Sequence, residues 1–494
     1  MVQTRRDQLQ AYRFVTTRVQ SALLHGEPDA PETPMRRIGV AMVSGIMVAV
    51  LVAVGFGLFG LLKPGGKEGW KQPGTLVVEK ETGTRFVYIP ADGALHPVLN
   101  YASARLILNS ADISVKYFSR KSLADAPRGL PRGIPGLPDS LPDSKGLVSG
   151  PWTVCSRPAA DITKPPGMTV SVRYPVSGQH VDNAHALLVK TRTNAYLIWN
   201  DHQLKITSDT AIDALHYDES LALPVADTWV NAIPAGPELR AVHLAGVGTP
   251  GKDVAGQRSL IGQVFRVPGA GNAKPTYWVA LQDGLASTTE TDALLLLADV
   301  DNSKAYSGRN ANFIDISAAD LVDARSNRQV ITAGFPPTVP SQLSPQAAES
   351  QVACAAYSGT DGSSTDVTVS LAREVPGARP QTTVTGGLTA GQTADQVLLP
   401  PGTAAVVRSL PRGNQPTDGY YIVTDSGGLY PVPNADVLGV LGFGGVTATP
   451  VPSGILELIP RGPALDPATA NTESPVQGGS VQIPLGPDQQ GGGG

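Results

Sequence analysis

An uncharged segment near the N-terminus constrains this chain more than any other feature of its sequence. Residues 38–62, IGVAMVSGIMVAVLVAVGFGLFGLL, carry no charged side chain over 25 positions. A helix of that length reaches about 37 Å, and the hydrocarbon core of a bilayer is about 30 Å thick. A cleaved signal peptide would have a shorter apolar region and a small-residue cleavage site, which LLKP at 61–64 does not supply. We therefore predict a membrane-spanning signal anchor at 38–62.

The basic residues around this segment predict its orientation. Three lysines follow it closely, Lys63, Lys67 and Lys71. The arginines that precede it are Arg5, Arg6, Arg13, Arg18, Arg36 and Arg37. Because positive charge is retained on the cytoplasmic side, we expect a cytoplasmic N-terminus and roughly 430 residues outside the cell membrane.

Small residues recur every four positions along the predicted membrane helix. Such a stripe lets a second transmembrane helix approach closely, although chance also produces partial stripes in Ala- and Gly-rich spans. The residues of this stripe are Ala41, Gly45, Ala49, Ala53 and Gly57.

The cytoplasmic segment has the pattern of an amphipathic helix that Thr4 caps and Gly26 ends. We expect it to lie on membrane lipid at the inner leaflet or to dock on a cytoplasmic partner; a plain polar helix is the alternative. Its apolar face is formed by Leu9, Tyr12, Val15, Val19 and Leu23.

Composition favours short strands and turns outside the membrane. The chain has 494 residues with 54 glycines and 43 prolines, and its length is ample for two or three cores. A net charge of −4 gives no basic footprint for nucleic acid, so nucleic acid is not expected as a partner.

Four stretches share one layout, an apolar strand, a tight turn and a second strand, followed by a helical Ala/Leu pattern. Asp-Gly between alternating apolar runs is a strong hairpin signal. The sequence therefore predicts four divergent hairpin-plus-helix units, at unequal intervals. The stretches are FVYIPADGALHPV (86–98), YLIWNDHQLKI (196–206), YWVALQDGLAS (277–287) and YYIVTDSGGLYPV (420–432).

Three patterns resemble catalytic or ligand sites and are weighed against plain turns. Ser426 in DSGG is absent from the other three units, so we predict that it sits in a turn, although a triad could be assembled from distant residues. GVGTPGKD at 246–253 places Asp253 where a phosphate loop needs Ser or Thr, so ATP binding is a minor alternative there. His180 and His185 lack the spacing of a usual metal site. No catalytic, cofactor-binding or metal residue is predicted.

The two cysteines, Cys155 and Cys354, both fall in the part predicted to lie outside the cytoplasm, where disulfides persist. A bridge over 199 positions would restrict the unfolded chain by about 5 kcal/mol in the loop-entropy model. It would also tie the segments on either side of the second and third units into one central domain. Two separately buried thiols are the alternative.

Several motifs follow one another in a specific order along the chain. They are NYASARLI (100–107), PRGIPGLP (131–138), WTVC (152–155), IPAGPEL (233–239), ADQVLLPPG (394–402), YYIVTDSGGLYPV (420–432) and LIPRGPAL (458–465). In this order they resemble signatures of EccB, the single-pass membrane component of type VII (ESX) secretion systems. The resemblance runs from TRRDQLQAYRFVTTR near the N-terminus to about Leu465.

This resemblance implies a fold and a set of partners. The fold class is α+β and β-rich: one transmembrane helix, then an elongated periplasmic region of four small repeats around a central β domain closed by a Cys155–Cys354 disulfide. The implied partners are the EccC motor ATPase, EccD, EccE and the mycosin protease, and a homodimer through the outer domain is a further hypothesis. Some family members are described as ATPases, but no family catalytic motif maps onto this sequence.

We therefore expect a structural, membrane-anchored core subunit of a secretion machine. A membrane-anchored ATPase, a cell-wall hydrolase and a peptidoglycan-binding module are the alternatives. The expected parts are a cytoplasmic helix and linker (1–37), membrane helix (38–62), linker (63–74), repeat 1 (75–120), central domain (121–185), repeat 2 (186–254), repeat 3 (255–305), central domain again (306–395), repeat 4 (396–450) and a C-terminal extension with a disordered tail (451–494).

Overall fold

The computed structural model divides the chain into two compact units. The first combines Met1–Gln72 with Phe118–Asp125, and the second combines Pro73–Tyr117 with Ala126–Gly494. The structure describes residues 5–26, 34–62, 69–159, 164–208, 210–307, 309–344, 352–358, 366–375, 377, 393–411, 417 and 419–474.

Two long helices dominate the first unit. The cytoplasmic helix expected from the sequence is α1, Arg5–His25, and the apolar helix is α2, Pro34–Leu62. α2 begins before the predicted residue 38 because a proline fits the first helical turn, where its missing N–H has no helical partner to lose. Within it, Ile38–Leu58 has a mean hydropathy of 2.5 with no part buried, so it is long and apolar enough to cross a membrane.

Short 3-10 helices follow these two in the first unit. They are η1, Gly69–Lys71, and η2, Arg120–Leu123, which Ser119 caps by accepting a hydrogen bond from the backbone N–H of Ser122. η1 and η2 are about fifty positions apart in sequence, yet both belong to the unit that contains α2.

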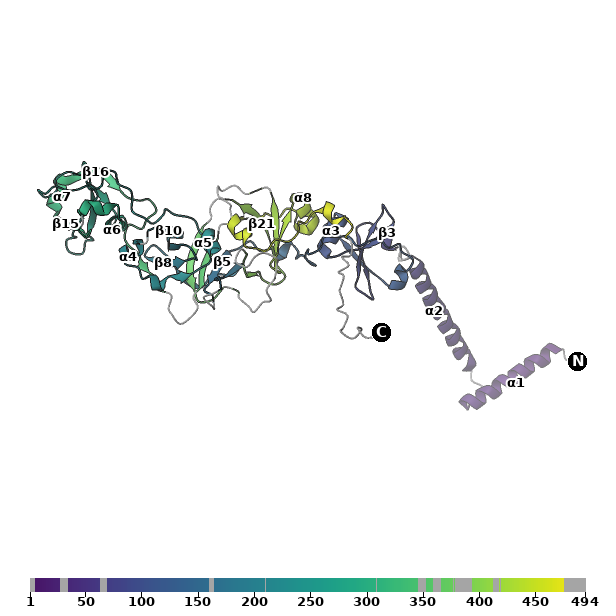
Figure 1. Cartoon of the computed structure of the whole chain (residues 1–494). Coiled ribbons are helices and arrows are strands. Elements are labelled where there is room, and N and C mark those ends of the chain that lie inside the picture. Colours follow the sequence, from purple (N-terminus) through teal and green to yellow (C-terminus); the bar gives the residue numbers. More distant parts are fainter. Residues whose placement is uncertain are drawn as a thin grey trace, which may run out of the picture. The chain divides into compact units, whose positions relative to one another are not determined.

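A six-stranded central sheet collects strands from three distant parts of the second unit (Figure 1). Its order is β20-β6-β5-β18-β19-β7, and β5 pairs antiparallel with both β6 and β18. The strands are β5 (Trp152–Arg157), β6 (Gly167–Val172), β7 (Gly178–His180), β18 (Val352–Tyr357), β19 (Val367–Ala372) and β20 (Gln396–Leu398).

Each of the four other sheets contains one predicted hairpin, and all four hairpins are confirmed. The first hairpin sheet, ordered β3-β2-β1-β4, has β1 (Thr75–Glu79), β2 (Arg85–Ile89), β3 (Ala94–Pro97), β4 (Ser114–Phe118) and helix α3 (Tyr101–Leu108). The second, β10-β9-β8-β11 with β17 beside β8, has β8 (His185–Lys190), β9 (Ala195–Trp199), β10 (His202–Ile206), β11 (Leu223–Pro224), β17 (Ser341–Gln342) and helices α4 (Ala211–Ala214) and α5 (Asp227–Ala232).

The third and fourth hairpin sheets follow the same plan. The third, β15-β12-β13-β14-β16, has β12 (Val264–Val267), β13 (Thr276–Leu281), β14 (Gly284–Thr288), β15 (Ile314–Asp315), β16 (Arg325–Val330) and helices α6 (Glu290–Ala298) and α7 (Ala318–Ala324). The fourth, β23-β22-β21-β24, has β21 (Ala404–Leu410), β22 (Tyr420–Thr424), β23 (Leu429–Val432), β24 (Thr449–Pro452), helices α8 (Ala435–Leu438), α9 (Ser453–Glu457) and α10 (Pro467–Ala470), and the π-helical turn η6 (Gly439–Phe443).

Local chemistry explains why a helix follows most of these hairpins. Asn100, Thr289 and Asn434 precede α3, α6 and α8, and each side chain accepts a hydrogen bond from a backbone N–H in the first turn. In the second hairpin, Asn200 and Asp201 take positive φ angles of 48° and 60°, which these residue types tolerate better than most.

A Pro-x-Gly segment docks in parallel on the second hairpin strand in three of the sheets. In the first sheet, the N–H of Leu95 donates to the carbonyl of Pro127 (2.8 Å), and the N–H of Gly129 donates to the carbonyl of Leu95 (3.0 Å). The same pair of bonds joins Gln203 to Pro234 and Gly236, and joins Leu429 to Pro460 and Gly462. In the third sheet Leu285 instead faces Arg325 of β16, without proline or glycine. The hairpin pattern in the sequence did not predict this docked segment.

Strand pairing moves several expected domain boundaries. Residues 127–132 belong to the first hairpin sheet rather than to the central domain, and β15 and β16 extend the third sheet to Val330 rather than ending it at 305. β20 belongs to the central sheet instead of repeat 4. The boundaries were placed at changes in composition, and parallel pairing between distant residues leaves no such mark.

The C-terminal extension is also partly corrected. β24, α9 and α10 are folded parts of the fourth hairpin sheet and its surroundings, and the side chains of Ile455 and Leu465 are fully buried. The N–H of Ser474 donates to the carbonyl of Pro131 (2.9 Å). The last described residue is therefore bonded to the segment that docks on the first hairpin sheet. The tail was predicted to be disordered from Leu465 onward, and that is wrong for its first residues, because α10 and the bonded Asn471 and Ser474 follow Leu465. The rest of the tail, 475–494, lies outside the described residues.

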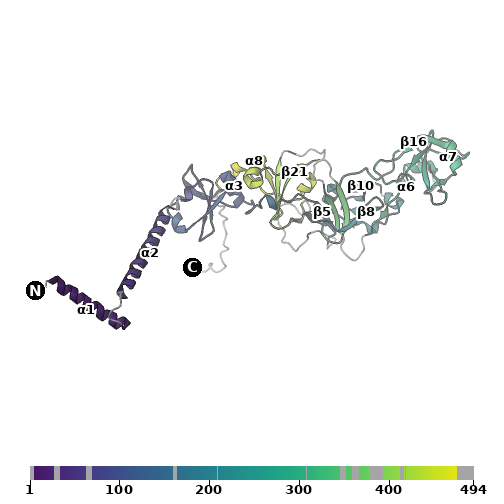
Figure 2. The ribbon, with the colours of Figure 1, turned by 180° about the vertical axis from the view of Figure 1, so that it is seen from behind.

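The central sheet and its neighbours share one hydrophobic core. That core includes Val154 of the central sheet, Leu187 of the second hairpin sheet and Val407 of the fourth. α3 lies beside α8 and η6 in both views of the ribbon (Figures 1 and 2), where Arg105 donates a hydrogen bond to the carbonyl of Leu441. This hydrogen bond thereby also joins the helices that follow the first and fourth hairpins.

The Pro-x-Gly docking predicts an asymmetry between two nearby glycines. A Cβ at Gly462 would lie 2.4 Å from the buried Tyr430 ring, whereas a Cβ at Gly454 in α9 meets nothing within 4 Å. Gly462→Ala should therefore lower the free energy of unfolding by about 1–3 kcal/mol, the usual cost of overpacking. Gly454→Ala should leave it unchanged or raise it slightly. Urea unfolding of the full chain in detergent measures both; equal midpoints for the two variants would contradict the docking.

Candidate functional site

The β5–β18 pair brings the two cysteines face to face. Cys155 and Cys354 are directly opposite in the antiparallel register, with 4.1 Å between their Cα atoms. This is the close spacing of a non-hydrogen-bonded pair, in which side chains approach most nearly. They form a disulfide with an S–S distance of 2.07 Å, and both side chains are fully buried. The predicted bridge between two distant segments is confirmed.

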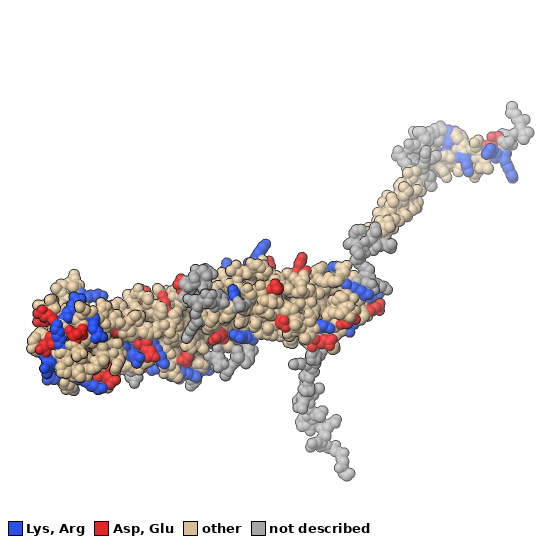
Figure 3. Space-filling view, turned by 90° about the horizontal axis from the view of Figure 1, so that it is seen from above, with Lys and Arg blue, Asp and Glu red and all other residues tan. Residues whose placement is uncertain are grey.

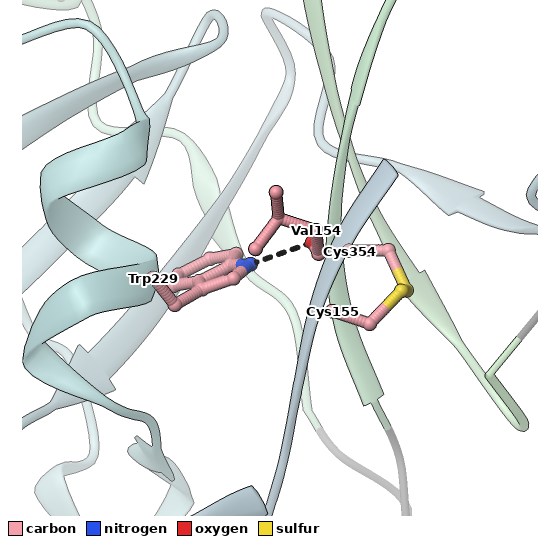
Figure 4. Close-up of a disulfide and its surroundings, with 4 residues drawn as sticks. All are labelled: Val154, Cys155, Trp229 and Cys354. Atoms are coloured by element: carbon pink, nitrogen blue, oxygen red, sulfur yellow. Dashed lines mark hydrogen bonds between the residues drawn. A yellow bond between two sulfur atoms is a disulfide. The ribbon is translucent and has the colours of Figure 1, made fainter. Parts of the chain in front are cut away.

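The two faces of this strand pair have different surroundings. On the disulfide face, Val352, Val375 and Leu398 pack around the sulfur atoms. On the other face, Trp229 of α5 is fully buried and donates its indole N–H to the carbonyl of Val154 at 3.1 Å (Figure 4). The bridge and the tryptophan therefore fix β5 from opposite sides.

Ser426 lies in the tight turn between β22 and β23. The N–H of Gly427 donates to the carbonyl of Thr424 (2.9 Å), and the Ser426 hydroxyl is 2.7 Å from that of Thr424. Burial raises the pKa of the Tyr430 phenol, and a hydrogen bond with Ser426 opposes that rise. The hydroxyl thus pairs with other hydroxyl groups, and the prediction of a turn is confirmed.

The GVGTPGKD loop does not have phosphate-loop geometry. The ammonium group of Lys252 donates to the carbonyl of Asp323 in α7 at 2.7 Å. The following residues form a tight bridge between Val254 and Gln257 before β12, whereas a phosphate loop leads into a helix whose N-terminal N–H groups face the phosphates.

The two histidines singled out by the sequence face separate aspartates. His180 Nε2 is 3.2 Å from Asp201 Oδ1, and His185 Nδ1 is 2.7 Å from Asp182 Oδ1. The hydrogen bond from His185 lowers the pKa of Asp182. Within the described ranges, no three or more His, Cys, Asp or Glu side chains gather as a metal site would require.

The two predicted helix surfaces are exposed in the first unit. The apolar side chains on the predicted face of α1 are 51–81% exposed, and those of α2 form an uncharged surface (Figure 3). No atom within 4 Å would meet a Cβ at Gly45 or Gly57 of the small-residue stripe. Their roles in helix packing and docking stay predictions.

Arg132 links two segments that are far apart in the sequence, and no sequence pattern singled it out. It donates to the carbonyl of Asn471 (2.7 Å) across 339 positions, and its guanidinium lies 3.6 Å from both Asp92 and Glu473. The nearly fully buried His96 ring has its Nε2 2.7 Å from Asp92 Oδ2. The pKa of Asp92 is lowered, mainly by the hydrogen bond from the N–H of Ala94 and also by this contact with His96. The PRG motif was visible, but its distant partner was not.

These features define a membrane-anchored protein whose strand-rich unit is closed by a disulfide. The profile of the family described as "Type VII secretion system ESX-1, transport TM domain B" (EccB) matches residues 1–476. The chain belongs to the EccB family of type VII secretion membrane components.

Known relatives are similar over nearly the whole chain. The ESX-3 secretion system ATPase EccB3 of Mycolicibacterium smegmatis is 28% identical over 487 residues, which cover 93% of this chain and 89% of that protein. The ESX-5 secretion system ATPase EccB5 of Mycobacterium tuberculosis is 26% identical over 492 residues, which cover 95% of this chain and 93% of that protein.

Solved structures share the fold. A chain of the periplasmic assembly from the ESX-5 inner membrane complex has a TM-score of 0.67 at 24% identity, covering 84% of this chain and 98% of that one. A chain of the EccB3 dimer from the ESX-3 core complex has a TM-score of 0.62 at 23% sequence identity, covering 80% of this chain and 99% of that one. The α+β, strand-rich fold class is confirmed.

The disulfide generates a stability prediction. Cys155→Ala combined with Cys354→Ala should lower the free energy of unfolding of the second unit by about 2–5 kcal/mol, because the unfolded chain loses a long-range constraint. The measurement is the melting temperature of the full chain, compared with wild type before and after reduction. An unchanged melting temperature in the double variant would contradict a structural role for the bridge.

Proposed function

We propose that this protein is a structural core subunit of a type VII secretion inner membrane complex, anchored by α2, whose second unit scaffolds the extracytoplasmic side. The observation that carries the proposal is the architecture itself. One apolar helix precedes in sequence a strand-rich unit, and backbone pairing, a shared core and one disulfide hold the five sheets of that unit's described residues. Family membership over residues 1–476 supports the same role.

The proposal includes an orientation, with α1 in the cytoplasm and the second unit in the periplasm. It is supported by the six arginines before α2 and by the disulfide, which persists in an oxidising compartment.

A pair of reporter fusions tests this orientation. A reporter active only outside the cytoplasm should be active after Ser474 and silent before Pro34, because α2 crosses the membrane once between them. A cytoplasmic reporter at the same two positions is the matched control and should give the opposite result. Activity of the outer reporter before Pro34 would overturn the orientation.

The proposed partners are the EccC motor ATPase, EccD, EccE and the mycosin protease, together with membrane lipid and a second copy of this chain. Their support is family membership and, for the second copy, the fold shared with the EccB3 dimer. Purification of the tagged chain from its own cell in mild detergent, followed by mass spectrometry, tests them. Recovery of the chain without other secretion components would count against the scaffold role.

A second candidate function, nucleotide hydrolysis, rests on the word ATPase in the names of the relatives. Lys252 is the residue on which it would depend, and its ammonium group is bound to a backbone carbonyl in α7.

Two substitutions separate the scaffold from an enzyme. Lys252→Ala and Ser426→Ala should both leave secretion by a complemented deletion strain within about twofold of wild type, because Lys252 binds the backbone carbonyl of Asp323 and Ser426 pairs with the Thr424 hydroxyl. Cys155→Ala is the comparison expected to reduce it through instability. Loss of secretion by Lys252→Ala, with the protein still folded and assembled, would favour the nucleotide hypothesis.

A further inference from the structure

Two segments of the first unit gather just beyond the apolar helix. η1 begins seven positions after the last residue of α2, so their Cα atoms are at most about 25 Å apart whatever path the connecting chain takes. Phe118, which precedes η2, lies against Gly69 of η1: a Cβ at Gly69 would be 3.4 Å from the Phe118 ring. The chain therefore leaves the second unit after Tyr117, meets η1 at Phe118 and rejoins the second unit at Ala126.

Basic side chains predominate on these segments. Lys71, Arg120 and Lys121 are all exposed, and Asp125 is the one acidic residue in 69–72 and 118–125. The connecting residues 63–68 add two lysines and one glutamate. The part of the chain next to the membrane helix thus has five basic and two acidic residues.

The rest of the chain beyond the helix has the opposite charge. Removing the six basic and four acidic residues of 1–37 from the totals of 38 and 42 leaves 32 basic and 38 acidic residues beyond α2. Removing the five basic and two acidic residues next to the membrane helix leaves 27 basic and 36 acidic residues, which is a net charge of −9. On the face of the second unit seen in Figure 3, these acidic and basic side chains are interspersed.

We propose that Lys71, Arg120 and Lys121 form a surface, the basic collar, that binds anionic phospholipid headgroups on the side of the membrane that carries the second unit. Cations within a Debye length of about 10 Å are attracted to an anionic lipid surface, whereas the acidic remainder is repelled by it. Trp70, 4% exposed, lies under the Lys71 ammonium group at 5.4 Å from its ring centroid and so places that charge.

The test uses the full chain with a single added thiol. Both native cysteines are in the disulfide, so Ser122→Cys in η2 gives one site for a fluorescent donor. The protein is reconstituted in bilayers that contain phosphatidylglycerol and phosphatidylcholine, with the acceptor on the headgroup of one lipid or the other. Energy transfer measures the local preference for the anionic lipid.

The labelled wild type should prefer phosphatidylglycerol, and this preference should weaken in high salt. Arg120→Gln and Lys121→Gln should each lower it by about fivefold, the ratio that corresponds to the attraction of one cation near an anionic surface. Arg258→Gln with Lys274→Gln, two exposed basic residues of the second unit, is the matched control pair and should leave it unchanged.

Two outcomes would overturn the proposal. Equal transfer to both lipids in the wild type would show that the collar does not select anionic headgroups, as expected if its true ligand is an acidic protein. A loss in the control pair equal to that in the collar variants would show that net charge alone governs the signal. Because the readout needs neither secretion nor a particular orientation of the chain, it is independent of the proposed function.

Discussion

The pairing of β5 with β18 is the contact on which the rest of the second unit depends. It joins two strands almost two hundred positions apart, and the sheets built between them are inserted into the loop that it closes. The largest core then forms on one face of this sheet, where Val154 and Trp229 meet side chains of the second and fourth hairpin sheets. Hydrophobic burial on that face and the disulfide on the other act on the same strand pair, so the loss of either weakens both.

Features set by neighbouring residues were predictable. Asp-Gly and Asn-Asp turns need positive φ or tight local bonding, and side chains such as Asn100 signal a helix start within three residues of themselves. The apolar helix was equally plain, because composition alone decides it. Counting left two outcomes for the cysteines, one bridge or two separately buried thiols, and the resemblance to EccB favoured the bridge.

Features set by distant parallel pairing were not predictable in the same way. PRG and PAG look like loop sequences, since proline and glycine are rare inside strands. In the structure they are short docked segments whose glycine permits contact with His96, Leu204 or Tyr430. A signal did exist: each proline follows its partner strand residue by 31 or 32 positions. Arg105 and Arg132 carried no such regularity, because each also donates to one backbone carbonyl more than three hundred residues away.

The nested arrangement of strands has a consequence for the order in which the protein matures. β5 and β6 are synthesised about 180 residues before β18, so a chain that emerges N-terminus first holds them without their central partner while the second and third hairpin sheets are completed. Cys155 must remain an unpaired thiol throughout that interval, open to reaction with the wrong partner. Correct oxidation is therefore a late event, timed by the arrival of Cys354, and the first hairpin sheet gains its contacts with Asn471 and Ser474 still later, once those residues have been made.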